Sequence, residues 1–293
     1  ELVRGYANMC ATLGSVSLNK MAENYRRRAV KMAAKVDDLA TRAYIQIPLS
    51  SHSLWVGNWQ RAEAEIGEAL DIYARLGDWR RWCVAAWLWP QVVESQGRLP
   101  AALELWGELL AVAQRSHDTR HEVRSQGGRM FNFVALGQWE EATACVTAVG
   151  VLLDENPEMK PVEERLWHAL NARLALHEGR WADARQQTAA LLDAIERARF
   201  KFDLLDVFAT AVEVNLALWA RGEATEAEAR TAVKVLQQYA RTYAFARPRL
   251  LRAQARLAWQ ADKPRRAQQL WRQGMDRAEA LGMVVAQGSI WYD

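Results

Sequence analysis

The feature that most restricts the fold of this chain is a motif that returns about every forty residues. In its clearest copies a Gly is followed two positions later by Trp and five positions later by Ala, as in Gly57, Trp59 and Ala62. The copies begin at residues 17, 57, 97, 137, 179, 222 and 262. A fixed period of this length is the signature of a repeat architecture.

Each part of the motif has a structural reason. Gly ends a helix because it readily adopts positive φ, the aromatic residue fills the corner of the turn, and Ala allows two helices to approach closely. Each copy therefore predicts two antiparallel helices. The first helices are expected at 1–16, 38–55, 79–95, 121–136, 162–178, 204–220 and 247–261, and the second at 18–35, 59–76, 99–116, 139–153, 181–198, 224–242 and 264–281. We predict an all-α, right-handed superhelical solenoid of about seven antiparallel helix pairs.

The domain organisation follows from this repeat. Residues 1–293 are predicted to form a single solenoid, and the apolar helical pattern at both ends suggests a fragment of a longer protein. Breaks between pairs are expected at several short segments, among them 199–203. The longest loop is expected at 154–161, which makes it the candidate seam between two subdomains.

Composition excludes several classes of protein. The chain is 51% hydrophobic and 25% charged, which argues against intrinsic disorder. Cys10, Cys83 and Cys145 each lie in an apolar helical run, so we expect buried, reduced thiols in a cytoplasmic protein. No stretch approaches 18 uncharged apolar residues, so no membrane span is expected. The net charge of only +3 argues against nucleic acid as a partner.

No catalytic signature is present. A glycine-rich phosphate loop, a nucleophile motif and paired acid and base residues are all missing, so the chain is not expected to be an enzyme or to hold a cofactor. His117 and His121 stand four residues apart, but Asp118 is a predicted break and the order of a zinc-binding helix is absent. No metal site is predicted.

The motif resembles the tetratricopeptide repeat in a long form of about forty residues. The phrases Met21–Tyr25, Leu76–Trp82 and Arg115–His121 resemble the C-terminal repeat region of bacterial signalling proteins that carry a STAND-type nucleoside-triphosphatase module. Many such proteins also carry a class III adenylate or guanylate cyclase, and related arrays end maltose-regulator-like transcription activators. The resemblance implies a sensor or scaffold arm that regulates a distant module.

The repeat register also predicts which side chains face the concave groove of the solenoid. These candidate partner-binding residues come from the first helix of each pair: Tyr44, Ile47, Trp87, Gln91, Glu94, Arg124, Phe131, Arg173, Trp219, Arg249, Arg252, Arg256 and Trp259. Ala209, Val212 and Leu216 are placed on the same face. This surface is too apolar for a merely solvated face, so a partner or neighbouring helices should cover it.

Two features of this face suggest what it could bind. Seven of the 14 Trp residues lie between Trp55 and Trp106. Trp87 is assigned to the groove and Trp89 to the core, and Pro90 should kink their helix. These aromatics either fill spaces between helices or form a platform for a peptide side chain or a sugar ring.

The second feature is a basic stripe on the first helix of the last pair. Arg249, Arg252 and Arg256 share one helical face within a segment, 246–293, that holds nine Lys or Arg against four Asp or Glu. The stripe is either a solvated basic face or a clamp for an acidic peptide or a phosphate-bearing group.

The leading hypothesis is a non-catalytic interaction and sensor domain that binds a protein or peptide in the groove and regulates an attached cyclase or ATPase. The parent protein's own upstream domains could be that partner, and a homo-oligomer could form through the terminal pairs. The alternative is a receptor for a small sugar or nucleotide-like inducer.

Overall fold

The computed structural model describes residues 1–198 and 204–293, and every regular element in these residues is helical. The predicted break at 199–203 lies outside the described residues. The α-helices are α1 (Leu2–Gly14), α2 (Asn19–Ala33), α3 (Leu39–Val56), α4 (Trp59–Leu76), α5 (Trp79–Ala86), α6 (Trp89–Ser95), α7 (Leu99–Ser116), α8 (Thr119–Ala135), α9 (Trp139–Glu155), α10 (Lys160–His177), α11 (Trp181–Arg197), α12 (Leu205–Ala220), α13 (Glu226–Thr242), α14 (Arg247–Gln260), α15 (Pro264–Ala280) and α16 (Val284–Tyr292). Short 3-10 turns, η1 (Pro157–Met159) and η2 (Ala244–Ala246), precede α10 and α14.

The turns within the pairs confirm the repeat register. All five Gly residues at the predicted turn positions have positive φ, for example 79° at Gly57 and 76° at Gly137. The two degenerate copies follow the same rule without Gly, because Ser17 has φ 65° and Asp262 has φ 54°. The repeat therefore imposes the left-handed backbone conformation even where the side chain opposes it.

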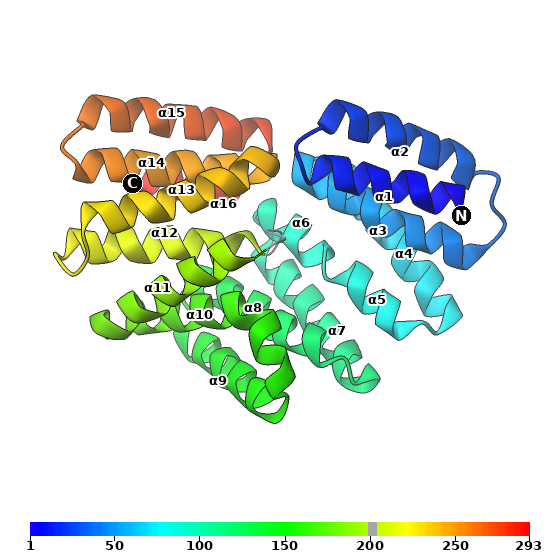
Figure 1. Ribbon diagram of the computed structural model, residues 1–293, viewed down its shortest axis with the longest axis horizontal. Helices are drawn as coiled ribbons and strands as arrows, with labels where there is room; N and C mark the ends of the chain where they lie inside the picture. The colour runs from blue at the N-terminus through cyan, green and yellow to red at the C-terminus, as the bar shows by residue number, and fades with distance from the viewer. Residues whose placement is uncertain (199–203) are drawn as a thin grey trace. The chain divides into compact units, whose positions relative to one another are not determined.

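Neighbouring helices pack as a helical-repeat fold requires. The two helices of a pair contact each other, for example α3 and α4, α10 and α11, or α14 and α15. The first helix of one pair also contacts the first helix of the next pair, for example α1 and α3, or α10 and α12. Figure 1 shows these pairs as antiparallel rods in chain order. The all-α fold of antiparallel helix pairs is thus confirmed.

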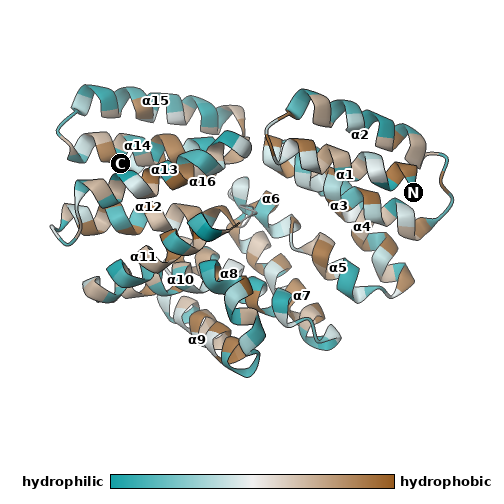
Figure 2. Cartoon of the chain, in the orientation of Figure 1, coloured by the Kyte–Doolittle hydropathy of each residue, from teal (hydrophilic) through white to brown (hydrophobic). Residues whose placement is uncertain are grey.

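Two second helices, α2 and α15, bury mainly small residues. On α15 the buried positions are Ala267, Gly274 and Ala278, and on α2 they are Ala22, Arg26 and Ala29. The other positions are mainly polar, and Figure 2 colours both helices largely hydrophilic. Small buried side chains allow these two helices to lie close to their partners.

The sixth copy of the motif differs from the prediction. The Ala that follows each turn is fully buried in the other copies, but Ala227 is exposed and Ala229 is buried in its place. The second helix also begins at Glu226 instead of the expected 224. Two extra residues in this turn, between Gly222 and the helix, move the small buried position by the same amount.

The first helix of the third pair is interrupted, as expected from a kink at Pro90. It forms two pieces, α5 and α6, that meet at Trp87 and Leu88. Pro90 has no N–H to donate to the carbonyl of Ala86, and its ring crowds that carbonyl. Pro48 lies inside α3 without interrupting it, so Pro alone does not determine a break.

The aromatic corner residues are less enclosed than the motif suggests. Trp139 and Trp181 are half-buried, whereas we expected buried plugs. The ring of Trp139 stacks on His177 at a centroid distance of 3.5 Å, and the guanidinium of Arg221 lies 4.1 Å from the centre of the Trp181 ring. These Trp rings cover the outside of the turn instead of filling its interior.

The chain divides into two compact units. Unit 1 comprises 1–122 and 241–245, and unit 2 comprises 123–240 and 246–293. The predicted seam at 154–161 falls within unit 2, and the prediction of one continuous solenoid with that seam stays a prediction. Cys10, Cys83 and Cys145 are buried and free, and burial raises the pKa of the Cys10 and Cys83 thiols to about 11. None of the helices in the described ranges combines the length and apolar character that a membrane crossing requires.

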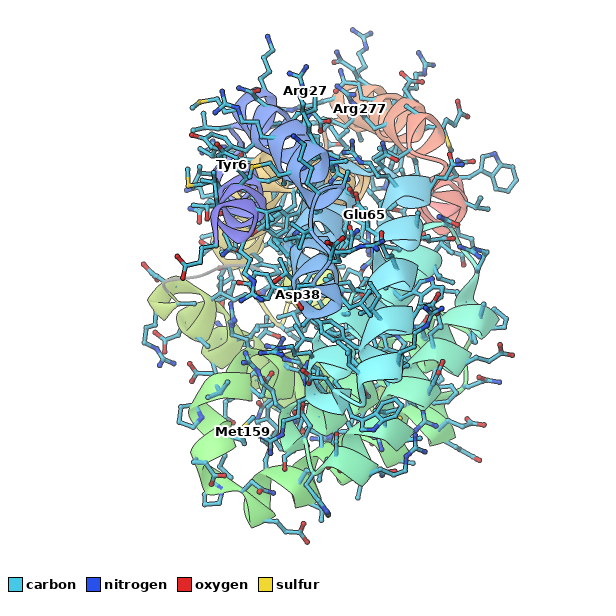
Figure 3. The ribbon with its side chains drawn as sticks, turned by 90° about the vertical axis from the view of Figure 1, so that its right-hand side faces the viewer. Tyr6, Arg27, Asp38, Glu65, Met159 and Arg277 are labelled. Carbon is cyan, nitrogen blue, oxygen red and sulfur yellow. The ribbon has the colours of Figure 1, made fainter. Side chains whose placement is uncertain are left out.

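Unit 1 contains a buried ion pair between Arg26 of α2 and Glu65 of α4. Figure 3 shows Glu65 among the N-terminal helices. Arg26 also donates to the carbonyl of Leu49 at 3.2 Å, and Ser53 donates to Glu65 at 2.8 Å. Desolvation lowers the pKa of Arg26 to about 10. The pair joins α2 to α4 through contacts with α3, and each partner would be an unpaired buried charge without the other.

Candidate functional site: an arginine-lined pocket in unit 2

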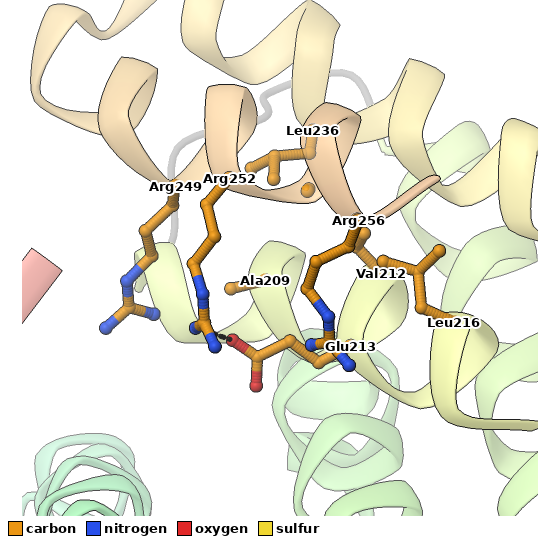
Figure 4. A pocket seen from close by; sticks show the side chains of 9 residues that line it. Ala209, Val212, Glu213, Leu216, Leu236, Arg249, Arg252 and Arg256 are labelled. Carbon is orange, nitrogen blue, oxygen red and sulfur yellow. Dashed lines mark ion pairs between the residues drawn. The ribbon is translucent and has the colours of Figure 1, made fainter. Parts of the chain in front are cut away.

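The candidate site with the most residues from the predicted groove face lies between α12 and α14 in unit 2. Its lining consists of Ala209, Val212, Glu213, Leu216, Leu236, Arg249, Arg252, Ala253 and Arg256. Figure 4 shows the side chains of Arg252 and Arg256 on either side of Glu213, with Arg249 farther from it. Six of these nine residues are ones that the repeat register placed together on the groove face.

Glu213 is the centre of the charged groups. Arg173 of α10 donates to a carboxylate oxygen of Glu213 at 2.8 Å, and the guanidinium of Arg252 lies 3.9 Å from the other oxygen. Burial alone raises the pKa of Glu213, but the charges of the four arginines outweigh it, and the pKa lies below its usual value. Glu213 is therefore a carboxylate at neutral pH.

The four arginines around Glu213 differ in how many ion pairs and hydrogen bonds they form. Arg249 pairs with Asp206, and Arg252 donates two hydrogen bonds to Asp293, at 2.8 and 3.0 Å. Arg256 lines the pocket without an ion pair or hydrogen bond to any described residue. A guanidinium that is half-buried and unpaired is the group best able to accept an incoming anion.

The pocket is small and mixed in character. Its cavity volume is only about 20 Å³. Whole small molecules usually occupy sites of roughly 300 to 1,000 Å³. Apolar side chains from α12 form one wall, and guanidinium groups form the other. The dimensions suit a single side chain that ends in a carboxylate better than an entire ligand.

The ion pairs of unit 2 repeat with the period of the fold. Arg173 and Glu213 are 40 positions apart, Arg249 and Asp206 are 43 apart, and Arg124 and Glu163 are 39 apart. Equivalent positions of consecutive first helices are neighbours in a helical-repeat fold. Glu213, which the sequence reasoning missed, could have been found by searching one repeat beyond Arg173.

The other candidates in unit 2 do not join this pocket. Arg124 is buried and its guanidinium pairs with Glu163 at 3.0 Å, and Phe131 is buried. Trp219 packs on an alanine-rich cluster, and Trp259 is 55% exposed with its ring 5.8 Å from that of Trp271. They stay candidate partner-binding residues without a shared site.

The candidates in unit 1 are largely occupied by contacts within the unit. Trp87 and Gln91 are 8% and 3% exposed, and Gln91 donates to the carbonyl of Trp87 at 2.8 Å. Trp89, assigned to the core, is the more exposed of the two tryptophans. Trp87 is thus buried where the register expected an open groove position, and the helix is interrupted at Trp87 itself and at Leu88.

The remaining three residues are half-buried. Tyr44 is half-buried, accepts a hydrogen bond from Asn8 at 3.2 Å, and lies beneath the guanidinium of Arg4. Ile47 is half-buried. Glu94 accepts a hydrogen bond from the indole of Trp106 at 3.4 Å. Their assignment to a partner-binding surface stays a prediction.

Comparison with known proteins identifies the fold but no family. No protein-family model matches the chain, and no curated protein matches its sequence. A Rap protein crystallised with the competence and sporulation factor superposes with a TM-score of 0.69 at 14% identity, over 96% of this chain and 76% of that chain. Apo RapI superposes with a TM-score of 0.63 at 10% identity, over 93% of this chain and 97% of that chain. NprR in complex with its cognate peptide NprX superposes with a TM-score of 0.54 at 14% identity, over 97% of this chain and 82% of that chain. At these identities the similarity shows the fold alone, and this chain shares the tetratricopeptide-like helical-repeat fold of those proteins.

Proposed function

We propose that this chain is a non-catalytic, peptide-binding regulatory domain, and that the pocket between α12 and α14 binds an acidic group of the peptide. The carrying observation is the set of four arginines, Arg173, Arg249, Arg252 and Arg256, around a single carboxylate. Arg256 has no partner of its own among the described residues. An acidic side chain or a peptide C-terminus would pair with it in a partly desolvated site, where such a bond is strongest.

The fold neighbours support a peptide as the class of partner. One of the solved structures holds the competence and sporulation factor, and another holds a cognate peptide. The small volume of the arginine pocket also favours one side chain of a longer ligand over a complete sugar or nucleotide. The attached output module, a cyclase or an ATPase as the sequence resemblance implies, stays a prediction.

The test uses rhodamine-labelled octapeptides that differ only in one central residue, Glu or Gln, in an otherwise uncharged sequence. Fluorescence anisotropy measures their affinity for the full chain at two salt concentrations. We expect the Glu peptides to bind about tenfold more tightly than the Gln peptides, with an advantage that shrinks in high salt.

Two variants assign this preference to the pocket. Arg256→Gln removes the unpaired cation and should abolish the preference for Glu. Glu213→Gln removes the internal competitor and should increase the affinity for acidic peptides. Arg265→Gln, an exposed position outside the pocket, is the matched control for charge. A preference for Glu that survives Arg256→Gln, or a loss of affinity in Glu213→Gln with its helicity retained, would overturn the assignment.

A further inference from the structure

A second pocket lies in unit 2 between α13, α14 and α15. Its cavity volume is about 220 Å³, and its mouth is open to solvent. Its lining consists of Arg230, Val233, Lys234, Gln237, Gln254, Leu257, Ala258, Ala261, Lys263, Arg266 and Leu270. On α14 these residues alternate with those of the arginine pocket, so the two pockets use different faces of the same helix.

The charges of this second pocket are all of one sign. Arg230 and Lys234 come from successive turns of α13, and Lys263 and Arg266 come from the beginning of α15. No lining residue is acidic. Arg230 shares its charge with Glu226, whereas Lys234, Lys263 and Arg266 form no ion pair with any described residue. Cations held together without a counter-ion repel each other, and a bound anion relieves that repulsion.

The rest of the lining is suited to the uncharged part of a ligand. Val233, Leu257 and Leu270 provide an apolar surface, one from each of the three helices. Gln237 and Gln254 provide amide groups that can donate and accept hydrogen bonds. The pocket thus combines separated cations, a few neutral polar groups and an apolar wall.

We propose that this second pocket binds a small molecule that carries more than one phosphate group on a partly apolar body. Two cations on α13 and two on α15 match a ligand whose negative charges are distributed over several oxygens, which a single carboxylate cannot provide. The beginning of α15 adds backbone N–H groups that no side chain caps. This site is independent of the proposed peptide pocket, because it shares no lining residue with it.

Isothermal titration calorimetry on the full chain tests the proposal with three probes: inorganic pyrophosphate, ADP and adenosine. Pyrophosphate and ADP should bind and compete with each other, with affinities that fall as salt rises, and adenosine alone should bind far more weakly. ADP should bind more tightly than pyrophosphate because its base and ribose add apolar contact. The absence of any pyrophosphate or ADP binding at low ionic strength would overturn the proposal.

Charge-matched double variants separate the pocket from the general basic surface. Lys234→Gln with Arg266→Gln removes one cation from each side and should weaken ADP about tenfold or more. Arg265→Gln with Arg272→Gln removes the same charge from exposed positions of α15 that do not line the pocket, and should leave the affinity unchanged. Equal weakening by both pairs would overturn the proposal and indicate a nonspecific charge effect.

Arg256→Gln distinguishes this proposal from the peptide-binding function. It should abolish the preference for acidic peptides and leave ADP binding unchanged, whereas the Lys234 and Arg266 variant should do the reverse. Circular dichroism of each variant verifies that the helices remain formed, which is expected because Lys234 and Arg266 are exposed and Arg256 is only half-buried.

Discussion

The ring of Tyr243 packs against the ring of Trp55, with their centroids 5.4 Å apart, although they come from opposite ends of the chain. Phe245 lies 6.4 Å from Trp59 in an edge-on arrangement, and the hydroxyl of Ser17 donates to the carbonyl of Arg241 at 2.9 Å. The segment 241–245 thus belongs to unit 1, while the helices before and after it belong mainly to unit 2.

Tyr243→Ala should destabilise unit 1 substantially. Tyr243 is 3% exposed, and deletion of a buried aromatic ring removes apolar contact and leaves a cavity, at a cost of about 3 kcal/mol. Urea unfolding followed by circular dichroism measures the loss. Tyr243→Phe retains the ring and is the control. Equal midpoints for the two variants would show that the ring contact contributes nothing.

The two glycines of α4 should respond to Ala in opposite directions. Gly77 ends the helix with φ 68°, so Gly77→Ala should cost about 1 to 2 kcal/mol of backbone strain. Gly67 lies inside the helix, so Gly67→Ala should raise the free energy of unfolding by about 0.5 to 1 kcal/mol. An added Cβ would meet no atom within 4 Å at either position, so packing cannot explain the difference. Thermal melts of the two variants should shift in opposite directions, and a shift in the same direction would contradict the argument.

His52 should make unit 1 sensitive to mild acid. It is 2% exposed, neither ring nitrogen has a hydrogen-bond partner among the described residues, and burial together with Arg26 and Arg61 lowers its pKa to about 4. Between pH 6.5 and 4 the unfolded chain binds a proton that the folded chain does not. Stability should therefore fall as pH decreases through this window, by roughly 3 kcal/mol in total.

Urea unfolding at a series of pH values tests this expectation. His52→Leu should remove most of the dependence between pH 6.5 and 4, because the titrating group is absent. His117→Asn, at an exposed histidine, should retain it. A His52→Leu profile parallel to that of the unmodified chain would show that other groups cause the acid sensitivity.

Removal of one partner of the buried ion pair should cost more than removal of both. Arg26→Leu leaves the carboxylate of Glu65 buried without its cation, at a cost of about 3 to 5 kcal/mol. Arg26→Leu combined with Glu65→Leu removes the uncompensated charge and should recover part of that loss. A double-mutant cycle of unfolding free energies measures the coupling, and strictly additive losses would show that the two charges do not stabilise each other.

Much of the repeat could be predicted from local sequence. The turn positions were correct even at Ser17 and Asp262, because a helix must end there for the apolar stripes of the two flanking helices to meet. The register also placed Ala209, Val212 and Arg252 on one face, and all three line one pocket, although their assignment to the groove stays a prediction. Side-chain direction along a regular helix depends only on the number of residues from a known reference position.

Local irregularities defeated the same reasoning. Trp87 is buried where the register placed it in the groove, because the helix breaks before Pro90 and the count of residues no longer gives the direction. In the sixth turn two additional residues moved the buried Ala to Ala229. Both errors arise where the regular 3.6-residue period is interrupted.

The sequence by itself therefore determined the helices, the turns between them and the faces on which arginines gather. Only the tertiary structure decided that Glu213 lies among those arginines, that Arg256 remains unpaired, and that Tyr243 packs on Trp55. The physical reason is the range of the interactions. Helix periodicity and positive φ depend on neighbours within one turn. The Arg173–Glu213 ion pair and the Trp55–Tyr243 contact instead join positions 40 or more residues apart, and they depend on how the helix pairs pack.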